Sequence, residues 1–414
     1  MFVFFYNTFI RLYIFLAKLI SPFNAKSKQF IICRKDWYKK YSFLRKKENI
    51  IWIHCASLGE YELSIPIIKR LKEKLPNAYI LVSFFSPSGY IYKKEIQEVD
   101  FYAYIPFDLP VEMKKWVELT NPKLVLFAKY ELWYNCISTL VDKNIPIVVF
   151  SASFRENQIY FKTYAFPYLT KLKAINHYFV VDEQSAHVLN KHKIYNVTVN
   201  GDTRFEKVYS NFISFKKMPE IEEFLDGQAC MILGSAWIQD VEFVSGIVNN
   251  RAFPLKVIVA PHDIQDQNIS RIKKYFLREV VMYSKISKVC SSCADVLIID
   301  CIGVLTNLYG YGKIAFVGGA FKQGLHNILE PLAFGLPVFF GPKFQKYPEA
   351  LMAIKKGVGF SVNNTNDFQK KMEELIHNAD YYAKVSEIAQ KWIQENKNTS
   401  QKISNYCIQL LNIN

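Results

Sequence analysis

The sequence is poor in the features that mark an oxidised or a metal-bound protein. Eight cysteines are present among 414 residues, and their spacing forms no disulfide framework. Cys290 and Cys293 make a single C-x-x-C pair, without a second cysteine pair or a nearby histidine that would complete a zinc site. We therefore expect reduced thiols in a cytoplasmic protein, and we expect no metal centre.

Two phosphate-binding fingerprints are absent as well. No G-x-G-x-x-G motif follows the first predicted strand, and no G-x-x-x-x-G-K-[ST] motif occurs in the chain. The first motif holds the pyrophosphate of dinucleotides, and the second holds the phosphates of nucleoside triphosphates. The sequence therefore gives no support to dinucleotide-dependent redox chemistry or to P-loop hydrolysis, and no cofactor is predicted.

Acidic residues are outnumbered by basic ones, and the formal net charge is +15. Residues 1–47 contain eleven Lys and Arg residues but only one acid, Asp36, and so carry +10 of that charge. A nucleic-acid enzyme more often spreads its basic residues along a groove that includes the active site. Here the charge follows an apolar N-terminus, which favours an anionic membrane surface as partner over nucleic acid.

The apolar segment Met1–Ile20 is a poor signal peptide, because it lacks a charged start and a small-residue cleavage site. Asn7, Arg11 and Lys18 interrupt it, and all three fall within one narrow sector of a helix. We expect an amphipathic helix in the membrane interface, with this polar stripe toward the lipid headgroups. A membrane-spanning helix and a buried first helix are the alternatives.

Half of the residues are hydrophobic, so a large core can form, and the length of the chain favours two domains. From residue 50, apolar β-type runs alternate with helical patterns, which is typical of parallel sheets covered by helices. We predict strands at Ile50–Cys55, Tyr79–Phe84, Lys123–Phe127, Pro146–Ser151, Tyr178–Val181, Ala229–Gly234, Leu255–Ala260, Val296–Asp300, Lys313–Val317 and Pro337–Phe340.

These strands fall into two groups on either side of residues 211–228, a segment of mixed polarity without a strand signal. We predict a Rossmann-like domain at residues 48–210, a linker at 211–228 and a second Rossmann-like domain with C-terminal helices at 229–414. Residues 1–47 form the basic, membrane-associating segment before them. In such domains ligands bind beyond the carboxyl ends of the strands.

The loop after the first predicted strand, HCASLGE, ends in Glu60 at the start of a predicted helix. N–H groups at a helix start favour the ionised carboxylate, which is the form a general base needs. Glutamate is also common in the first turn of a helix for structural reasons. Glu60 can therefore be either a general base or a residue that only stabilises the start of its helix.

A second loop, between Lys313 and Pro342, carries three glycines before a short predicted helix. Asn327 stands at a plausible N-cap with Glu330 three residues later, as in a capping box. A helix start behind a glycine-rich loop favours an anionic ligand. Glu330 can instead serve only to cap its helix.

Several long segments resemble motifs of the Kdo transferases, which add 3-deoxy-D-manno-octulosonate (Kdo) to lipid A precursors. They are WIHCASLGE, YELW, SASFRENQIYFKTY, GDTRFEKV, APHD, DCIGV and GGAFKQGLHNILEPLAFGLPVFFGP, in matching order between Arg34 and Glu349. The resemblance implies an α/β protein with the GT-B glycosyltransferase fold, in which two Rossmann-like domains face each other across a cleft. It also implies inverting transfer of Kdo from CMP-Kdo to a tetraacyl lipid A precursor (lipid IVA) for lipopolysaccharide, on the cytoplasmic side of the inner membrane.

The same resemblance assigns roles to single residues. The first domain binds the acceptor, with Glu60 as catalytic base, Glu131 assisting the transition state and Arg204 stabilising charge. The second domain binds CMP through Pro261, His262, Ile302, Gly303, Val304, Asn327, Ile328, Leu329 and Glu330. Without the resemblance, Glu131 and Arg204 fit a structural ion pair equally well.

Two departures from the family pattern and two rival functions remain. Val304 occupies a position that is often polar in the family, so any contact there is made by the backbone, and Lys129 occupies a variable position. One rival is another GT-B enzyme, such as a UDP-sugar transferase or a sugar-nucleotide epimerase. The other is a membrane-bound sugar-nucleotide binder without catalysis. Protection by CMP but not by UDP would distinguish the Kdo transferases from the first rival. A turnover assay would distinguish them from the second.

Overall fold

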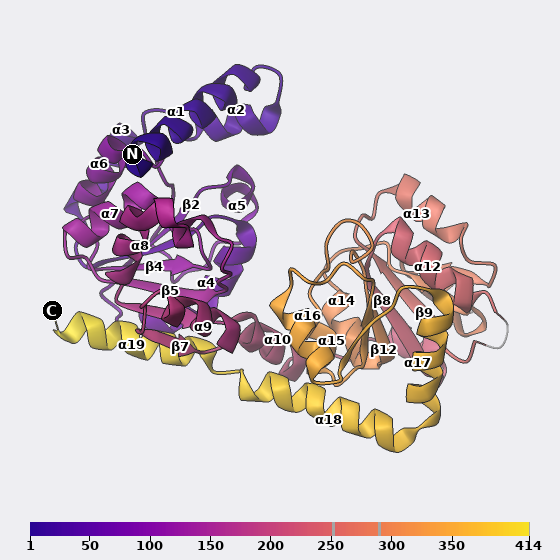
Figure 1. Ribbon diagram of the computed structural model, residues 1–414. Coiled ribbons are helices and arrows are strands. Elements are labelled where there is room, and N and C mark those ends of the chain that lie inside the picture. Colours follow the sequence, from indigo (N-terminus) through magenta and orange to yellow (C-terminus); the bar gives the residue numbers. More distant parts are fainter. Residues whose placement is uncertain (251–252, 289–290, 414) are drawn as a thin grey trace. The chain divides into compact units, whose positions relative to one another are not determined.

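The computed structural model describes residues 1–413 except 251–252 and 289–290 (Figure 1). The chain divides into two compact units. Unit 1 contains Met1–Arg204 and Asn398–Asn414, and unit 2 contains Phe205–Lys397. The chain therefore passes between the units twice, once after Arg204 and once after Lys397.

Unit 1 is built on a sheet of seven parallel strands in the order β3-β2-β1-β4-β5-β6-β7. The strands are β1 (Ile50–Cys55), β2 (Tyr79–Phe84), β3 (Phe101–Tyr104), β4 (Leu124–Ala128), β5 (Ile147–Ala152), β6 (His177–Val180) and β7 (Val197–Val199). The strand order reverses between β1 and β4. In open α/β sheets the crevice at the carboxyl ends of such a strand pair is where ligands bind.

Helices cover both faces of this sheet, because successive side chains of a strand point to opposite sides. Trp52 of β1 belongs to one core cluster with residues of α6 (Pro110–Thr120), α7 (Tyr134–Asp142), α8 (Phe166–Lys173) and α9 (Glu183–Lys191). Ile53 belongs to the cluster on the other face, with residues of α4 (Leu58–Lys74) and α19 (Thr399–Ile413). Shorter elements are α5 (Pro87–Tyr92), η2 (Ile159–Phe161) and η3 (Thr163–Ala165).

The last helix, α19, is part of unit 1 although it ends the chain. It lies against α4, where Arg70 Nε donates to Ser400 Oγ at 2.7 Å. Asn200 Nδ2 also donates to the backbone oxygen of Thr399 at 2.9 Å. The predicted second domain at 229–414 thus differs from unit 2, which ends at Lys397.

The N-terminal helices also belong to unit 1 and form no separate unit. They are α1 (Phe2–Ile20), α2 (Ala25–Ile32), α3 (Trp37–Lys40) and η1 (Ser42–Lys46). Tyr6 of α1 donates to Asp108 Oδ2 at 2.7 Å, and Asn7 Oδ1 accepts from Asn135 Nδ2 at 2.8 Å. Asn7 therefore faces the protein, and the prediction that it points toward lipid headgroups is wrong.

Unit 2 contains a second sheet of seven parallel strands, in the order β10-β11-β9-β8-β12-β13-β14. The strands are β8 (Cys230–Ala236), β9 (Lys256–Pro261), β10 (Val280–Met282), β11 (Val296–Ile298), β12 (Gly312–Val317), β13 (Val338–Phe340) and β14 (Gly359–Ser361). The helices are α10 (Arg204–Ile213), α11 (Pro219–Leu225), α12 (Ile238–Val248), α13 (Asp266–Lys273), η4 (Tyr283–Lys288), η5 (Ser291–Cys293), α14 (Leu305–Leu308), η6 (Tyr309–Tyr311), α15 (Leu329–Ala333), α16 (Pro348–Lys355), α17 (Thr365–His377) and α18 (Ala379–Glu395).

The segment predicted as a linker, 211–228, is largely helical. The end of α10 and all of α11 lie within it. Ile221, Phe224 and Leu225 of α11 are buried in the core of unit 2. The segment is therefore packed into unit 2, because its apolar residues recur at helical spacing and leave the solvent.

The predicted fold class, α/β with two parallel sheets, is confirmed. All ten predicted strands are present, with ends shifted by at most two residues. Four further strands, β3, β7, β10 and β14, were not predicted from the sequence. They are the two edge strands of each sheet.

Candidate active site

Glu60 lies at the carboxyl end of β1, in the first turn of α4. Its Oε2 accepts the backbone N–H of Ala56 and that of the N-cap residue Ser57, the latter at 3.2 Å, as in a capping box. Within the described part of the chain, no hydrogen bond reaches Oε1. The carboxyl therefore caps its helix through one oxygen and keeps the other for another partner.

The electrostatics of Glu60 differ from the expectation drawn from its place at a helix start. Its pKa is raised to about 7, chiefly by burial and in addition by the negative charge of Glu131. The charge of Lys129 and the N–H groups of Ala56 and Ser57 lower it, but burial outweighs them. A carboxyl with a pKa near neutrality can both accept and release a proton at the pH of the cell.

Lys129 and Glu131 come from the loop between β4 and α7. Burial raises the pKa of Glu131, and the charge of Lys129 lowers it. Lys129 has a left-handed backbone with φ of 59°, and its N–H donates to Phe150 at 2.9 Å. Because β1 and β4 are parallel neighbours that pair His54 with Phe127, both loops begin at the same edge of the sheet. The structure thus brings Glu60, Lys129 and Glu131 together at the point of strand reversal.

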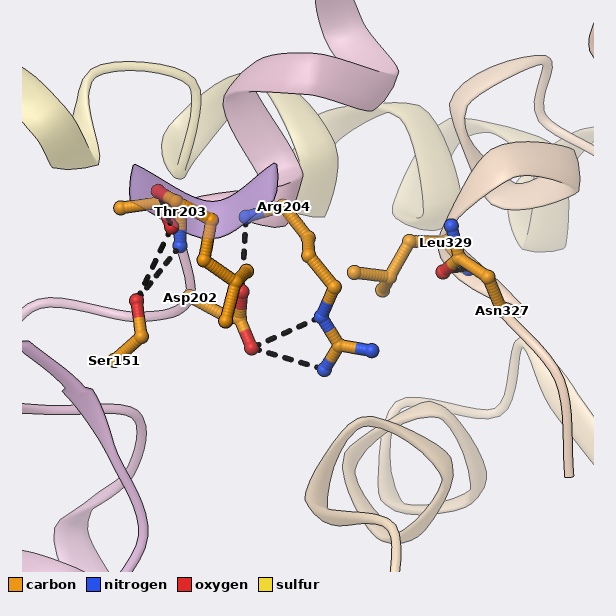
Figure 2. Close-up of polar contacts among 7 residues, drawn as sticks. Ser151, Asp202, Thr203, Arg204, Asn327 and Leu329 are labelled. Carbon is orange, nitrogen blue, oxygen red and sulfur yellow. Dashed lines mark hydrogen bonds and ion pairs between the residues drawn. The ribbon is translucent and has the colours of Figure 1, made fainter. Parts of the chain in front are cut away.

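A third segment of the candidate site, Asp202–Thr203, leads directly into α10 (Figure 2). Ser151 Oγ lies 3.2 Å from Thr203 Oγ1 and accepts the Thr203 N–H at 3.3 Å. Asp202 Oδ2 accepts from Arg204 Nε at 3.0 Å and lies 2.9 Å from a terminal guanidinium nitrogen. Arg204 is therefore held in an ion pair with Asp202, which fixes the direction of its side chain.

The residues expected to bind CMP lie in three loops of unit 2. Pro261 ends β9 and His262 follows it, Ile302–Val304 lie between β11 and α14, and Asn327–Glu330 lie between β12 and the first residues of α15. All three strands are parallel members of one sheet, so the three groups share its carboxyl edge. Gly303 has φ of +95°, a conformation that glycine adopts readily.

The predicted capping box of Asn327 and Glu330 is wrong, because α15 starts one residue later, at Leu329 with Ile328 as N-cap. Asn327 Oδ1 accepts the Leu329 N–H at 3.1 Å, two positions along the chain. Asn327 Nδ2 donates to Glu330 Oε1 at 3.3 Å, and Thr306 Oγ1 donates to Oε2 at 3.2 Å. Glu330 is therefore held by two side chains.

The sequence reasoning missed three residues at the edge of the unit 2 sheet: Trp237, Asp240 and His326. The Asp240 side chain is 1% exposed, and its Oδ2 accepts the N–H groups of Trp237 and Gly319, both at 2.9 Å. The sequence contained a signal for Asp240. Like Glu60, Asp240 is the third residue of a helix that directly follows a strand.

Within the described residues, no group of three or more His, Cys, Asp or Glu side chains could hold a metal ion. Cys290 of the C-x-x-C pair lies outside those residues. One described helix, Phe2–Ile20, is long and apolar enough to cross a membrane by length and composition.

The chain is similar to known proteins along most of its length. Residues 34–207 match the family model of the 3-deoxy-D-manno-octulosonic-acid transferases (kdotransferases). The chain is 28% identical to the 3-deoxy-D-manno-octulosonic acid transferase of Aquifex aeolicus over 354 residues, covering 83% of this chain and 90% of that one. It is 26% identical to the corresponding transferase of Haemophilus influenzae, covering 85% of each chain.

Solved structures agree on the fold. The structure of S. aureus MnaA with UDP aligns with a TM-score of 0.61 at 14% identity, and the alignment covers 88% of this chain and 98% of that one. The UDP-GlcNAc 2-epimerase of Neisseria meningitidis has a TM-score of 0.59 at 15% identity, covering 88% and 100%. The predicted fold class, two α/β units each built on a parallel sheet, is thereby confirmed. Residues 34–207 match the family model, and similarity to curated Kdo transferases runs along most of the chain, so the resemblance to the Kdo transferases that the sequence predicted is confirmed.

Proposed function

We propose that the protein transfers Kdo from CMP-Kdo to a glucosamine hydroxyl of lipid IVA, a phosphorylated, tetraacylated lipid A precursor, with inversion of configuration. The observation that carries this proposal is Glu60, a buried carboxyl at the strand reversal of unit 1 with its pKa raised to about 7. The choice of Kdo as the transferred sugar is supported by the similarity to the Kdo transferases.

In the proposed reaction Glu60 takes the proton of the acceptor hydroxyl while the oxygen of that hydroxyl attacks the anomeric carbon. Attack comes from the face opposite CMP, the bond from the anomeric carbon to the phosphate oxygen breaks, and its electron pair leaves on CMP. One displacement of this kind inverts the configuration. Arg204, directed by Asp202, is proposed to stabilise charge in the transition state, and Glu131 to assist it.

The proposed CMP site is formed by Pro261, His262, Ile302, Gly303, Val304, Asn327, Ile328, Leu329 and Glu330 of unit 2. Glu330 is the clearest member, because Thr306 and Asn327 each bind one of its oxygens. A carboxylate held in this way is suited to accept ribose hydroxyls. Ile302 and Val304 can contribute only backbone groups.

The proposed location is the cytoplasmic surface of the inner membrane, with α1 lying in the interface. One face of α1 packs on unit 1, where Ile10 and Ile14 are buried. Its other face is apolar and exposed, with the residues Phe4, Phe5, Phe9, Leu12, Phe15, Leu16, Leu19 and Ile20. A spanning helix would have to break the Tyr6–Asp108 and Asn7–Asn135 hydrogen bonds, which favours an interfacial helix.

The test is turnover of CMP-Kdo with lipid IVA by the full chain in detergent, followed by thin-layer chromatography. Glu60→Gln keeps the capping contact but removes basicity, so turnover should fall by about 10²–10⁴-fold. Glu62→Gln, on an exposed position of the same helix, is the matched control and should remain active.

Three outcomes would contradict the proposal. Near-normal turnover by folded Glu60→Gln protein would make Glu131 the better candidate for the base. Inhibition by UDP but not by CMP would favour another GT-B sugar-nucleotide enzyme. Binding of CMP without any turnover would favour a sugar-nucleotide binder without catalysis.

A further inference from the structure

Three aromatic rings from separate loops meet at the carboxyl edge of the unit 2 sheet. Trp237 follows β8, His262 follows β9, and His326 lies in the loop between β12 and α15. The strands β9, β8 and β12 are consecutive parallel neighbours, so their loops start side by side. Of these rings, only that of His262 belongs to the CMP site proposed above.

Trp237 and His326 form a nearly coplanar pair. Trp237 Nε1 donates to His326 Nε2 at 3.0 Å, and the two ring planes differ by 16°. The His262 ring is stacked on both, with its centroid 4.3 Å from that of Trp237 and 4.6 Å from that of His326. The hydrogen-bonded pair is thus a platform, and His262 lies across one of its faces.

The protonation of His326 suits this hydrogen bond. Burial, with a further contribution from neighbouring His262, lowers the pKa of His326 to about 4. The ring is therefore neutral near pH 7, with Nε2 accepting from Trp237 and the proton on Nδ1. A neutral His326 ring keeps Nε2 free of a proton and able to accept this hydrogen bond.

The backbone beneath the platform is fixed too. Asp240 binds the N–H of Trp237 and the N–H of Gly319, so it ties the loop after β8 to the loop after β12. The approach is close, since a Cβ on Gly318 would lie 2.5 Å from the Ser235 oxygen and 2.6 Å from Asp240 Oδ2. The two rings of the platform therefore come from loops that cannot shift independently.

We propose that Trp237 and His326 are positioning residues that hold the exposed imidazole of His262 for contact with the phosphate of a nucleoside monophosphate. The inference rests on the proposed donor site. An exposed histidine samples several rotamers, and ordering it on binding costs free energy. A ring already stacked on two others avoids much of that cost.

The experiment is a double-mutant cycle with CMP as the probe, measured by titration calorimetry on the full chain. Trp237→Leu removes the platform and should weaken CMP binding by about tenfold in the unchanged chain. In a chain that also carries His262→Ala, Trp237→Leu should weaken CMP binding by less than about twofold, because Trp237 then has no imidazole to position. Trp237→Phe keeps a ring for stacking but loses the N–H, so it should fall in between. Trp392→Phe, on α18, is the control.

The outcomes separate the inference from the proposed function. No CMP binding by the unchanged chain would overturn the donor site and this inference with it. CMP binding with equal losses on both backgrounds would overturn the inference alone, because Trp237 would then act independently of His262. Nitrogen-15 NMR gives a further check: a proton on Nε2 of His326 would be incompatible with the platform.

Discussion

At the scale of single residues, the Lys129 side chain acts electrostatically on Glu60, the proposed base. It lowers the pKa of Glu60, which burial and Glu131 raise. Lys129→Met should therefore move the acidic limb of the activity–pH profile to higher pH and reduce turnover at pH 6.5 by roughly two- to tenfold. Lys129→Arg keeps the charge and should leave the limb in place. An unchanged limb in Lys129→Met would show that Lys129 does not act on the base.

Glu330 offers a second prediction at this scale. Glu330→Gln should weaken CMP binding by about tenfold, because hydrogen bonds to an ionised carboxylate are stronger than those to an amide. The unfolding temperature should change little, since no capping box is lost at this position. Calorimetry with CMP and a thermal melt measure the two effects. Unchanged CMP affinity with a lower melting temperature would assign Glu330 a structural role alone.

The sequence placed Glu60 and Glu330 correctly at helix starts that follow strands, but it predicted a capping box only at Glu330 and left the helix-start role of Glu60 open. The capping box predicted at Glu330 is absent, and one is present at Glu60. The spacing from Ser57 to Glu60 equals that from Asn327, the predicted N-cap, to Glu330. The structure differs because α15 starts one residue later than predicted, and helix boundaries are poorly determined by local sequence.

At the scale of elements, the unpredicted strands share a physical cause. The central strands are buried on both faces and read as continuous apolar runs, as in β1 and β4. The edge strands are only three or four residues long, and β7 has no fully buried residue. Their pairing is imposed by the neighbouring strand, so the sequence alone carries little signal for them.

The helix α1 carries the prediction that belongs to this scale. Phe9→Glu with Phe15→Glu places two charges on its exposed face and should weaken binding to vesicles containing anionic lipid at least tenfold. Vesicle co-sedimentation measures this, with Asn363→Glu, at an exposed position of unit 2, as the control for an added charge away from this face. The unfolding temperature should not fall, because neither phenylalanine is buried. Full retention on vesicles would show that another surface makes the contact.

At the scale of the whole molecule, buried titratable groups set how stability depends on pH. Burial raises the pKa of Glu60 to about 7 and that of Asp108 to about 6, so the folded chain binds their protons more tightly than the unfolded chain. These two groups therefore add stability as the pH falls through about 7 and about 6. Burial lowers the pKa of His54 to about 3 and that of His326 to about 4, so around and below pH 6.5 the unfolded chain gains protons that the folded chain refuses, which removes stability.

Because these contributions oppose each other, the contribution of Glu60 is isolated by comparing the unchanged chain with Glu60→Gln. The unfolding temperature of the unchanged chain should rise relative to that of the variant as the pH falls below about 7. Differential scanning fluorimetry of both proteins between pH 8.5 and 5.5 measures this. A difference between the two proteins that stays constant over this range would contradict the raised pKa of Glu60.

The path of the chain has a consequence for synthesis. Unit 1 needs α19, whose Ile403 and Cys407 complete one of its two core clusters, yet unit 2 lies between α19 and the rest in the sequence. At ordinary rates of translation, roughly ten to forty seconds separate the emergence of Arg204 from that of α19. During that interval α4 covers its part of this sheet face, but the part that α19 covers in the folded chain stays open. We expect the newly made chain to expose there, at the ribosome, an apolar binding surface for chaperones that the folded protein lacks.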